Sequence, residues 1–207
     1  MEDAVKFRYS RLADDNCCLS CGGAMEKSGA APGEICIDLG SGRGTDVIRL
    51  ADIVGSKGFV YGVDATPEMV NKGRSAANKL GIDNVGFILS GLREIPLSSN
   101  LADLVISNCV INHVDRKDRV WMEIFRLLKK GGRFVISDIY SVEPVPDEYS
   151  SDPVAVAECW AGAVTRDEYL ATIERAGFKQ VRIIEESRPY EKGRINVCSF
   201  TVTGIKE

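Results

Sequence analysis

Cysteine is the residue type in this 207-residue sequence with the most varied chemistry available to it. The seven cysteines stand at positions 17, 18, 21, 36, 109, 159 and 198. Thiolates bind soft metal ions, exchange disulfides and act as nucleophiles, whereas a buried thiol behaves as a small apolar side chain. The odd count, in a chain whose start lacks a secretory signal, favours reduced thiols over a disulfide framework. Packing, redox chemistry and ligand binding are therefore the three roles open to them.

A glycine-rich turn spans residues 40–44 (Gly-Ser-Gly-Arg-Gly), between a predicted strand and a predicted helix. Glycines at such a junction let the backbone turn sharply and approach a ligand closely. Gly44 stands two positions after Gly42, whereas the dinucleotide-binding fingerprint requires a spacing of three. The turn therefore predicts a ligand site in which a dinucleotide is disfavoured.

Two aspartates flank this predicted site. Asp38 precedes the glycine turn, where its carboxylate suits a ligand with a cationic amino group better than a pyrophosphate. Asp64 ends the next predicted strand, where it can accept hydrogen bonds from ribose hydroxyls. The alternative role for Asp64 is to cap the helix that begins near Thr66.

Short apolar runs and helical periods alternate along the chain after residue 33. The predicted strands are residues 35–37, 59–63, 85–89, 101–107, 134–137, 181–184 and 197–202. A short helix is predicted in the first dozen residues, followed by helices over residues 45–54, about 115–129 and 165–177. A further helix begins at Thr66 and Pro67. Gly131 and Gly132 are expected to close the helix over residues 115–129. Residues 22–33 have the composition of a loop-like linker.

This order of elements predicts an α/β, Rossmann-like fold with a mostly parallel seven-stranded sheet and helices on both faces. The last two strands have no helix between them, so they should form an antiparallel C-terminal hairpin. We expect an N-terminal helix and cysteine-rich lid segment in residues 1–31 and one ligand-binding domain in residues 32–207.

Composition and charge exclude several function classes. The formal net charge is −4 and no basic block occurs, which argues against binding to nucleic acid. No apolar run approaches the roughly 20 residues that span a bilayer, and the chain opens with acidic residues, so we expect a cytoplasmic protein without a membrane partner. The sequence does not indicate an oligomeric state.

The glycine turn with its two aspartates, together with the Leu-Lys-Lys-Gly-Gly run at 128–132, resembles the class I S-adenosylmethionine-dependent methyltransferases. The resemblance implies that Asp38 faces the methionine amino group of the cofactor, that Gly40 and Gly42 lie against the cofactor, and that Asp64 binds its ribose. The further cofactor contacts that we expect are Ser41, Ala65, Leu92, Arg93 and Asn108.

Four further segments resemble the arsenite methyltransferase family. They are Ser-Asn-Cys-Val-Ile-Asn at 107–112, Phe-Val-Ile-Ser-Asp at 134–138, Pro-Val-Pro at 144–146 and Cys-Trp-Ala-Gly-Ala-Val-Thr at 159–165, with a Cys-Gly pair at 21–22 upstream. The resemblance implies that Cys21, Cys109 and Cys159 bind trivalent arsenic, the substrate, as arsenite or thiol-bound arsenic. A short lid makes Cys17 or Cys18 a substitute for Cys21. A thiol reductant, such as a thioredoxin-like protein, is the expected partner.

Two alternative functions remain open. Cys18 and Cys21 have the spacing of a redox dithiol, and with Cys17 and another thiol they could hold an iron–sulfur cluster or zinc. The methyl acceptor could also be a small organic molecule, with the cysteines incidental.

Three further residues carry expectations of their own. His113, the only histidine, stands where the arsenite methyltransferase family usually has an apolar residue, so we expect a bystander at the pocket rim rather than a proton acceptor. Cys36 and Cys198 fall within predicted strands and are expected in the core.

Overall fold

The computed structural model describes residues 2–13 and 22–207, in which an eight-stranded sheet forms the centre of the fold. The strands are β1 (Ile35–Leu39), β2 (Phe59–Asp64), β3 (Val85–Leu89), β4 (Ala102–Asn108), β5 (Leu128–Ser141), β6 (Lys179–Glu186), β7 (Tyr190–Lys192) and β8 (Ile195–Ile205). Their order is β3-β2-β1-β4-β5-β8-β6, with β7 paired to β8 beside this path. The first five strands of this order are parallel, and β8 is antiparallel to β5, β6 and β7. The predicted mostly parallel sheet with an antiparallel end is confirmed, and the short β7 is an addition to it.

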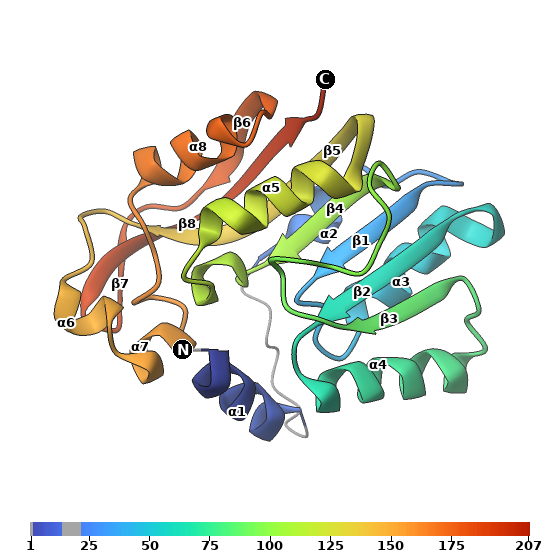
Figure 1. Ribbon diagram of the computed structural model, residues 1–207, viewed down its shortest axis with the longest axis horizontal. Coiled ribbons are helices and arrows are strands. Elements are labelled where there is room, and N and C mark those ends of the chain that lie inside the picture. Colours follow the sequence, from blue (N-terminus) through green and yellow to red (C-terminus); the bar gives the residue numbers. More distant parts are fainter. Residues whose placement is uncertain (1, 14–21) are drawn as a thin grey trace.

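Helices cover both faces of the sheet (Figure 1). They are α1 (Glu2–Leu12), α2 (Ala24–Lys27), α3 (Thr45–Val54), α4 (Pro67–Leu80), α5 (Lys117–Leu127), α6 (Asp147–Ser150), α7 (Pro153–Ala157) and α8 (Arg166–Arg175). Buried side chains of α5 and α8 pack on one face, and those of α2, α3 and α4 pack on the other. The sequence therefore builds the expected three-layer α/β arrangement.

The predicted start of α4 is confirmed. Thr66 is the extended residue before the helix and Pro67 occupies its first turn, where a missing N–H costs no helical hydrogen bond. Gly81 ends the helix in a left-handed conformation with φ 67°.

The predicted end of α5 is wrong by two residues. The backbone becomes extended at Leu128 (φ −70°, ψ 142°), where it pairs with Ala102 of β4. Gly131 donates its N–H to the carbonyl oxygen of Lys206 at 2.6 Å, and Lys206 donates to Gly132 at 2.9 Å. The two glycines therefore bind the chain after β8 instead of closing a helix.

The prediction of a loop over residues 22–33 is wrong at α2. Ala24 and Met25 are buried against β4 and β5 in the same core cluster as α3 and α4. Arg133 of β5 also donates to the carbonyl oxygens of Ser28 and Gly29, at 3.0 and 2.7 Å. This segment is therefore packed onto the sheet.

Within residues 2–13 and 22–207, no helix is long and apolar enough to cross a bilayer.

Candidate functional site

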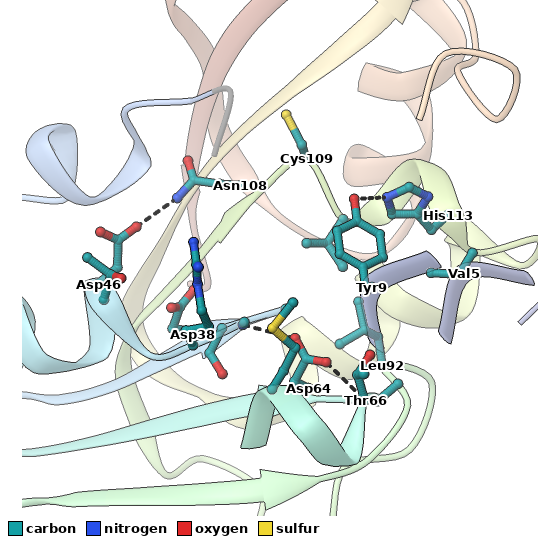
Figure 2. Close-up of a pocket in the computed structure, with 18 of the residues that line it drawn as sticks. Val5, Tyr9, Asp38, Asp46, Asp64, Thr66, Leu92, Asn108, Cys109 and His113 are labelled. Atoms are coloured by element: carbon teal, nitrogen blue, oxygen red, sulfur yellow. Dashed lines mark hydrogen bonds between the residues drawn. The ribbon is translucent and has the colours of Figure 1, made fainter. Parts of the chain in front are cut away.

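A cavity of about 460 Å³ opens where β1, β2 and β4 end (Figure 2). The carboxyl ends of parallel strands are the usual ligand-binding edge of an open α/β sheet. All of the residues predicted to contact a cofactor line this cavity: Asp38, Gly40, Ser41, Gly42, Asp64, Ala65, Leu92, Arg93 and Asn108. The fold thus brings together residues from four separate segments, and their roles toward a cofactor remain predictions.

The glycine turn forms the floor of the cavity. Gly40 and Gly42 are in left-handed conformations, with φ of 70° and 51°. The N–H groups of Gly40 and Ser41 both donate to the carbonyl oxygen of Val63, at 2.7 and 3.0 Å. A Cβ atom on Gly40 would lie 2.2 Å from the Val110 side chain, whereas one on Gly42 would meet nothing within 4 Å. Gly40 is therefore required by packing, and Gly42 leaves the backbone open toward the cavity.

Charged side chains of both signs line the cavity: the carboxylates of Glu26, Asp38, Asp46 and Asp64 and the basic groups of Lys6, Arg43, Arg49 and Arg93. Burial raises the pKa of Asp38 well above its usual 3.8, and the negative charges of Asp46 and Asp64 raise it further. Burial also raises the pKa values of Asp46 and Asp64. A cation bound beside these three aspartates would stabilise their ionised forms, so this part of the cavity favours a positively charged group.

Both proposed roles of Asp64 are compatible with its surroundings. Its Oδ1 accepts the Thr66 N–H at 2.8 Å, and its Oδ2 accepts the Gly42 N–H at 2.9 Å. The capping interaction is therefore present. Each carboxylate oxygen can accept a second hydrogen bond, so a ribose hydroxyl would not have to displace either amide.

Asn108 fixes the segment that precedes α2. Its side chain donates to Asp46 Oδ2 at 3.1 Å and accepts the Ala24 N–H at 3.2 Å. A Cβ atom on Gly22 would lie 2.7 Å from Asn108 Oδ1 and 2.3 Å from Ser137 Cβ. The chain at residue 22 therefore lies directly against the end of β4 and against Ser137 within β5.

Two of the predicted arsenic ligands are neighbours in the fold. Cys109 follows β4 and lines the cavity, and Cys159, which follows α7, packs against the Cys109 backbone. The Sγ atom of Cys159 lies 3.1 Å from the carbonyl oxygen of Cys109. Both side chains are buried, with 6% exposure, in a small apolar cluster that includes Val156 and Ile139.

The other cysteines divide as follows. Cys36 and Cys198 lie in the core, as expected, on opposite faces of the sheet. Cys17, Cys18 and Cys21 lie outside the described residues, so the third arsenic ligand and the redox, cluster or zinc alternative remain predictions. In the described part of the chain, no three His, Cys, Asp or Glu side chains are arranged to hold a metal ion.

His113 lines the cavity but is buried and hydrogen-bonded to Cys159, a predicted arsenic ligand, and its expected role as a bystander stays a prediction. Its Nδ1 lies 3.0 Å from the carbonyl oxygen of Val156, and its Nε2 lies 3.0 Å from Cys159 Sγ. A carbonyl oxygen only accepts, so Nδ1 carries the ring proton and Nε2 is an acceptor. Burial lowers the pKa of His113 to about 4, which keeps the ring neutral near neutral pH.

The N-terminal helix contributes residues that the sequence did not assign to the site. Val5, Lys6 and Tyr9 of α1 line the cavity. The Tyr9 hydroxyl faces His113 Nε2 at 3.1 Å, on the side of the cavity opposite Asp46 (Figure 2). The contact joins residues 104 positions apart, and no local pattern at Tyr9 predicts it.

Comparison with known proteins identifies a family. Residues 31–177 match a methyltransferase-domain family model. An arsenite methyltransferase of Halobacterium salinarum is 40% identical over 84% of this chain and 44% of its own length, and the human arsenite methyltransferase is 36% identical over 72% and 42%. The chain thus spans less than half the length of these curated relatives.

A solved structure agrees in sequence and in fold. An arsenic(III) S-adenosylmethionine methyltransferase from Chlamydomonas reinhardtii superposes with a TM-score of 0.79 at 31% identity, covering 96% of this chain and 73% of the other. The similarity confirms the Rossmann-like fold predicted above.

Proposed function

Because the chain belongs to the arsenite methyltransferase family, we propose that it transfers a methyl group from S-adenosylmethionine to trivalent arsenic. The observation that carries the proposal is that Cys109 lines the same cavity as Asp38 and Asp64, with Cys159 Sγ only 3.1 Å from the carbonyl oxygen of Cys109. A cofactor and a thiophilic substrate would then bind side by side.

The cavity fits a cationic cofactor. Asp38 would accept hydrogen bonds from the methionine ammonium group, and the open backbone at Gly42 would allow the cofactor to approach closely. Asp64 retains acceptor capacity for the ribose. Burial among other carboxylates makes Asp38 costly to ionise in the absence of a ligand, which supports a site built to receive positive charge.

Cys109 and Cys159 would supply two of three thiolate ligands to arsenic, since soft thiolates suit a soft ion. Cys21 is the proposed third ligand. Support for Cys21 comes from the Cys-Gly pair at 21–22, which resembles the corresponding pair of the arsenite methyltransferase family.

The reaction requires positioning more than proton transfer. S-adenosylmethionine would supply an electrophilic methyl group on its sulfonium. The lone pair of thiolate-bound arsenic would form the new bond to that methyl carbon, and the electrons of the broken sulfur–carbon bond would return to the cofactor sulfur. The chain's contribution is to align the two reactants and exclude water, which agrees with the buried thiols and the cover formed by α1.

The test uses the reduced full chain with arsenite, a thiol reductant and S-adenosylmethionine. We expect methylated arsenicals by chromatography with element-specific detection. Cys109→Ser and Cys159→Ser should abolish product while calorimetric binding of S-adenosylmethionine persists. Cys198→Ala, which changes a core thiol, is the matched control and should retain methylation.

Two outcomes would contradict the proposal. Cofactor binding by the wild-type chain without any arsenic product would favour an organic methyl acceptor. Visible charge-transfer absorption by the purified protein would favour an iron–sulfur cluster at the N-terminal cysteines. A thioredoxin-like reductant and a cytoplasmic location belong to the same proposal and are tested separately.

A further inference from the structure

The His113 ring has one acceptor and two neighbours that could donate to it. Its Nδ1 proton is committed to the Val156 carbonyl oxygen, 3.0 Å away. Its Nε2 lies 3.0 Å from Cys159 Sγ and 3.1 Å from the Tyr9 hydroxyl oxygen. Since Nε2 has a single lone pair, only one of the two neighbours can donate a full hydrogen bond to it at a time.

Cys159 and Tyr9 belong to different parts of the site. Cys159 is a proposed arsenic ligand, and as a thiol it can donate to His113 or to the carbonyl oxygen of Cys109. Tyr9 lies on α1, which packs against α7 and α4 (Figure 1) and lines part of the cavity. Arg8 of α1 also forms an ion pair at 3.4 Å with Glu158, the residue that follows α7.

We propose that His113 is a positioning residue that couples arsenic binding at Cys159 to closure of α1 over the cavity. The inference rests on the proposed function. When the Cys159 sulfur bonds to arsenic it has no proton to donate, so the Nε2 lone pair becomes available to Tyr9 alone. The Tyr9 hydrogen bond then holds α1 closed while the methyl group is transferred.

The exchange balances chemically. Each new sulfur–arsenic bond replaces an arsenic–hydroxyl bond of arsenite, and the thiol proton leaves with that hydroxide as water. The ring of His113 stays neutral with its proton on Nδ1 throughout, as its hydrogen bond to Val156 requires. Arsenic binding therefore changes only which side chain donates to Nε2.

Hydrogen exchange of Glu2–Leu12 in the full chain, with and without arsenite, tests the coupling. In the wild-type chain arsenite should slow exchange of α1 by about threefold to tenfold, the effect of one neutral hydrogen bond. Tyr9→Phe keeps the aromatic ring beside His113 but should remove this response. His113→Leu should also remove it.

Ser10→Ala is the matched control. It deletes the Ser10 hydrogen bond to Glu68 at 2.8 Å, which holds α1 to α4 without touching His113. Exchange of α1 should be faster in this variant in both states, with the arsenite response retained.

Bound arsenic, measured by mass spectrometry in the same samples, separates the two proposals. Absence of bound arsenic in the wild-type chain would contradict the proposed function. Stoichiometric arsenic with an equal response in wild type and Tyr9→Phe would overturn the coupling alone. Because coupling between two sites is reciprocal, Tyr9→Phe should also weaken arsenite binding to the full chain by about threefold to tenfold. An unchanged arsenite affinity in Tyr9→Phe would contradict the coupling.

Discussion

Cys159 directs its thiol at the backbone carbonyl oxygen of Cys109, 3.1 Å away, and both residues have left-handed backbones, with φ of 73° and 53°. For residues other than glycine, this conformation raises the free energy of the folded state by about 1 kcal/mol. Cys159 follows the C-cap residue of α7, the position where helix ends favour glycine. Both cysteines therefore occupy conformations that lower the stability of the fold. This agrees with a functional role for their thiols.

The cost of this conformation at residue 159 can be measured with two variants that both lack the thiol. We predict that Cys159→Gly has a higher free energy of unfolding than Cys159→Ala by about 1 kcal/mol, because only the alanine keeps a Cβ in the left-handed region. Urea denaturation compares the two. Equal stability, or a more stable alanine variant, would contradict the assignment of strain to this residue.

The fold could be predicted from the sequence where local signals decide the structure. Thr66 and Pro67 set the start of α4 through their own backbone preferences, and the predicted strand 85–89 is confirmed without change. The end of α5 could not be predicted in this way. Leu128 pairs with Ala102 of β4, and Gly131 binds Lys206 beyond β8, so partners distant in sequence decide the conformation there.

The same distinction applies to the site. The motif residues around Asp38 and Asp64 could be placed at one sheet edge because parallel strands end together. The contacts of His113 with Tyr9 and Cys159 span 104 and 46 positions, and they depend on how α1 and α7 pack. The only sequence signal was a histidine where relatives usually have an apolar residue.

Asp38→Asn should weaken cofactor binding but stabilise the ligand-free chain. The substitution removes a carboxylate whose pKa is raised by burial and by the charges of Asp46 and Asp64, so the ligand-free chain should unfold less readily at pH 8. Binding of S-adenosylmethionine should weaken by about 10- to 100-fold, the loss of a charge-assisted hydrogen bond. Calorimetry and urea denaturation give the two quantities.

Asp52→Asn, at an exposed position on α3, is the control for the change in net charge and should alter neither quantity measurably. Unchanged cofactor affinity in Asp38→Asn would exclude Asp38 from the proposed ammonium contact.

Two buried groups give stability opposite dependences on pH. Burial raises the pKa of Asp138 from 3.8 to about 7, so between these values the folded chain binds more protons and its unfolding free energy falls as pH rises. Burial lowers the pKa of His113 from 6.5 to about 4, so between those values the unfolded chain binds more protons and the unfolding free energy rises with pH. Each contributes about 1.4 kcal/mol per pH unit, and the two nearly cancel from about pH 4 to 6.5.

Single variants should reveal the cancellation. Relative to wild type, Asp138→Asn should gain stability as pH rises from about 4.5 to about 6, and His113→Gln should lose it. Asparagine at 138 can still accept the hydrogen bonds from Asn112 and the Ile139 N–H, at 2.9 and 2.8 Å. Urea denaturation across this range measures the slopes. Profiles parallel to wild type would contradict the assigned pKa values.

Gly162→Ala should disturb the spacing of Cys109 and Cys159, the two described cysteines that we propose as arsenic ligands. A Cβ atom on Gly162 would lie 1.9 Å from the carbonyl oxygen of Asn112, a backbone atom that cannot rotate away. The loop that carries Cys159 must then shift from the segment that carries Cys109. Overpacking of this kind destabilises a protein by about 1–3 kcal/mol, and a displacement near 1 Å can reduce a rate by about 100-fold. We therefore expect kcat for arsenic methylation to fall far more than the affinity for S-adenosylmethionine.

For stability, Gly91→Ala is the matched control, since a Cβ there would meet nothing within 4 Å. Wild-type stability and kcat in Gly162→Ala would contradict the idea that this contact sets the separation of the two thiols.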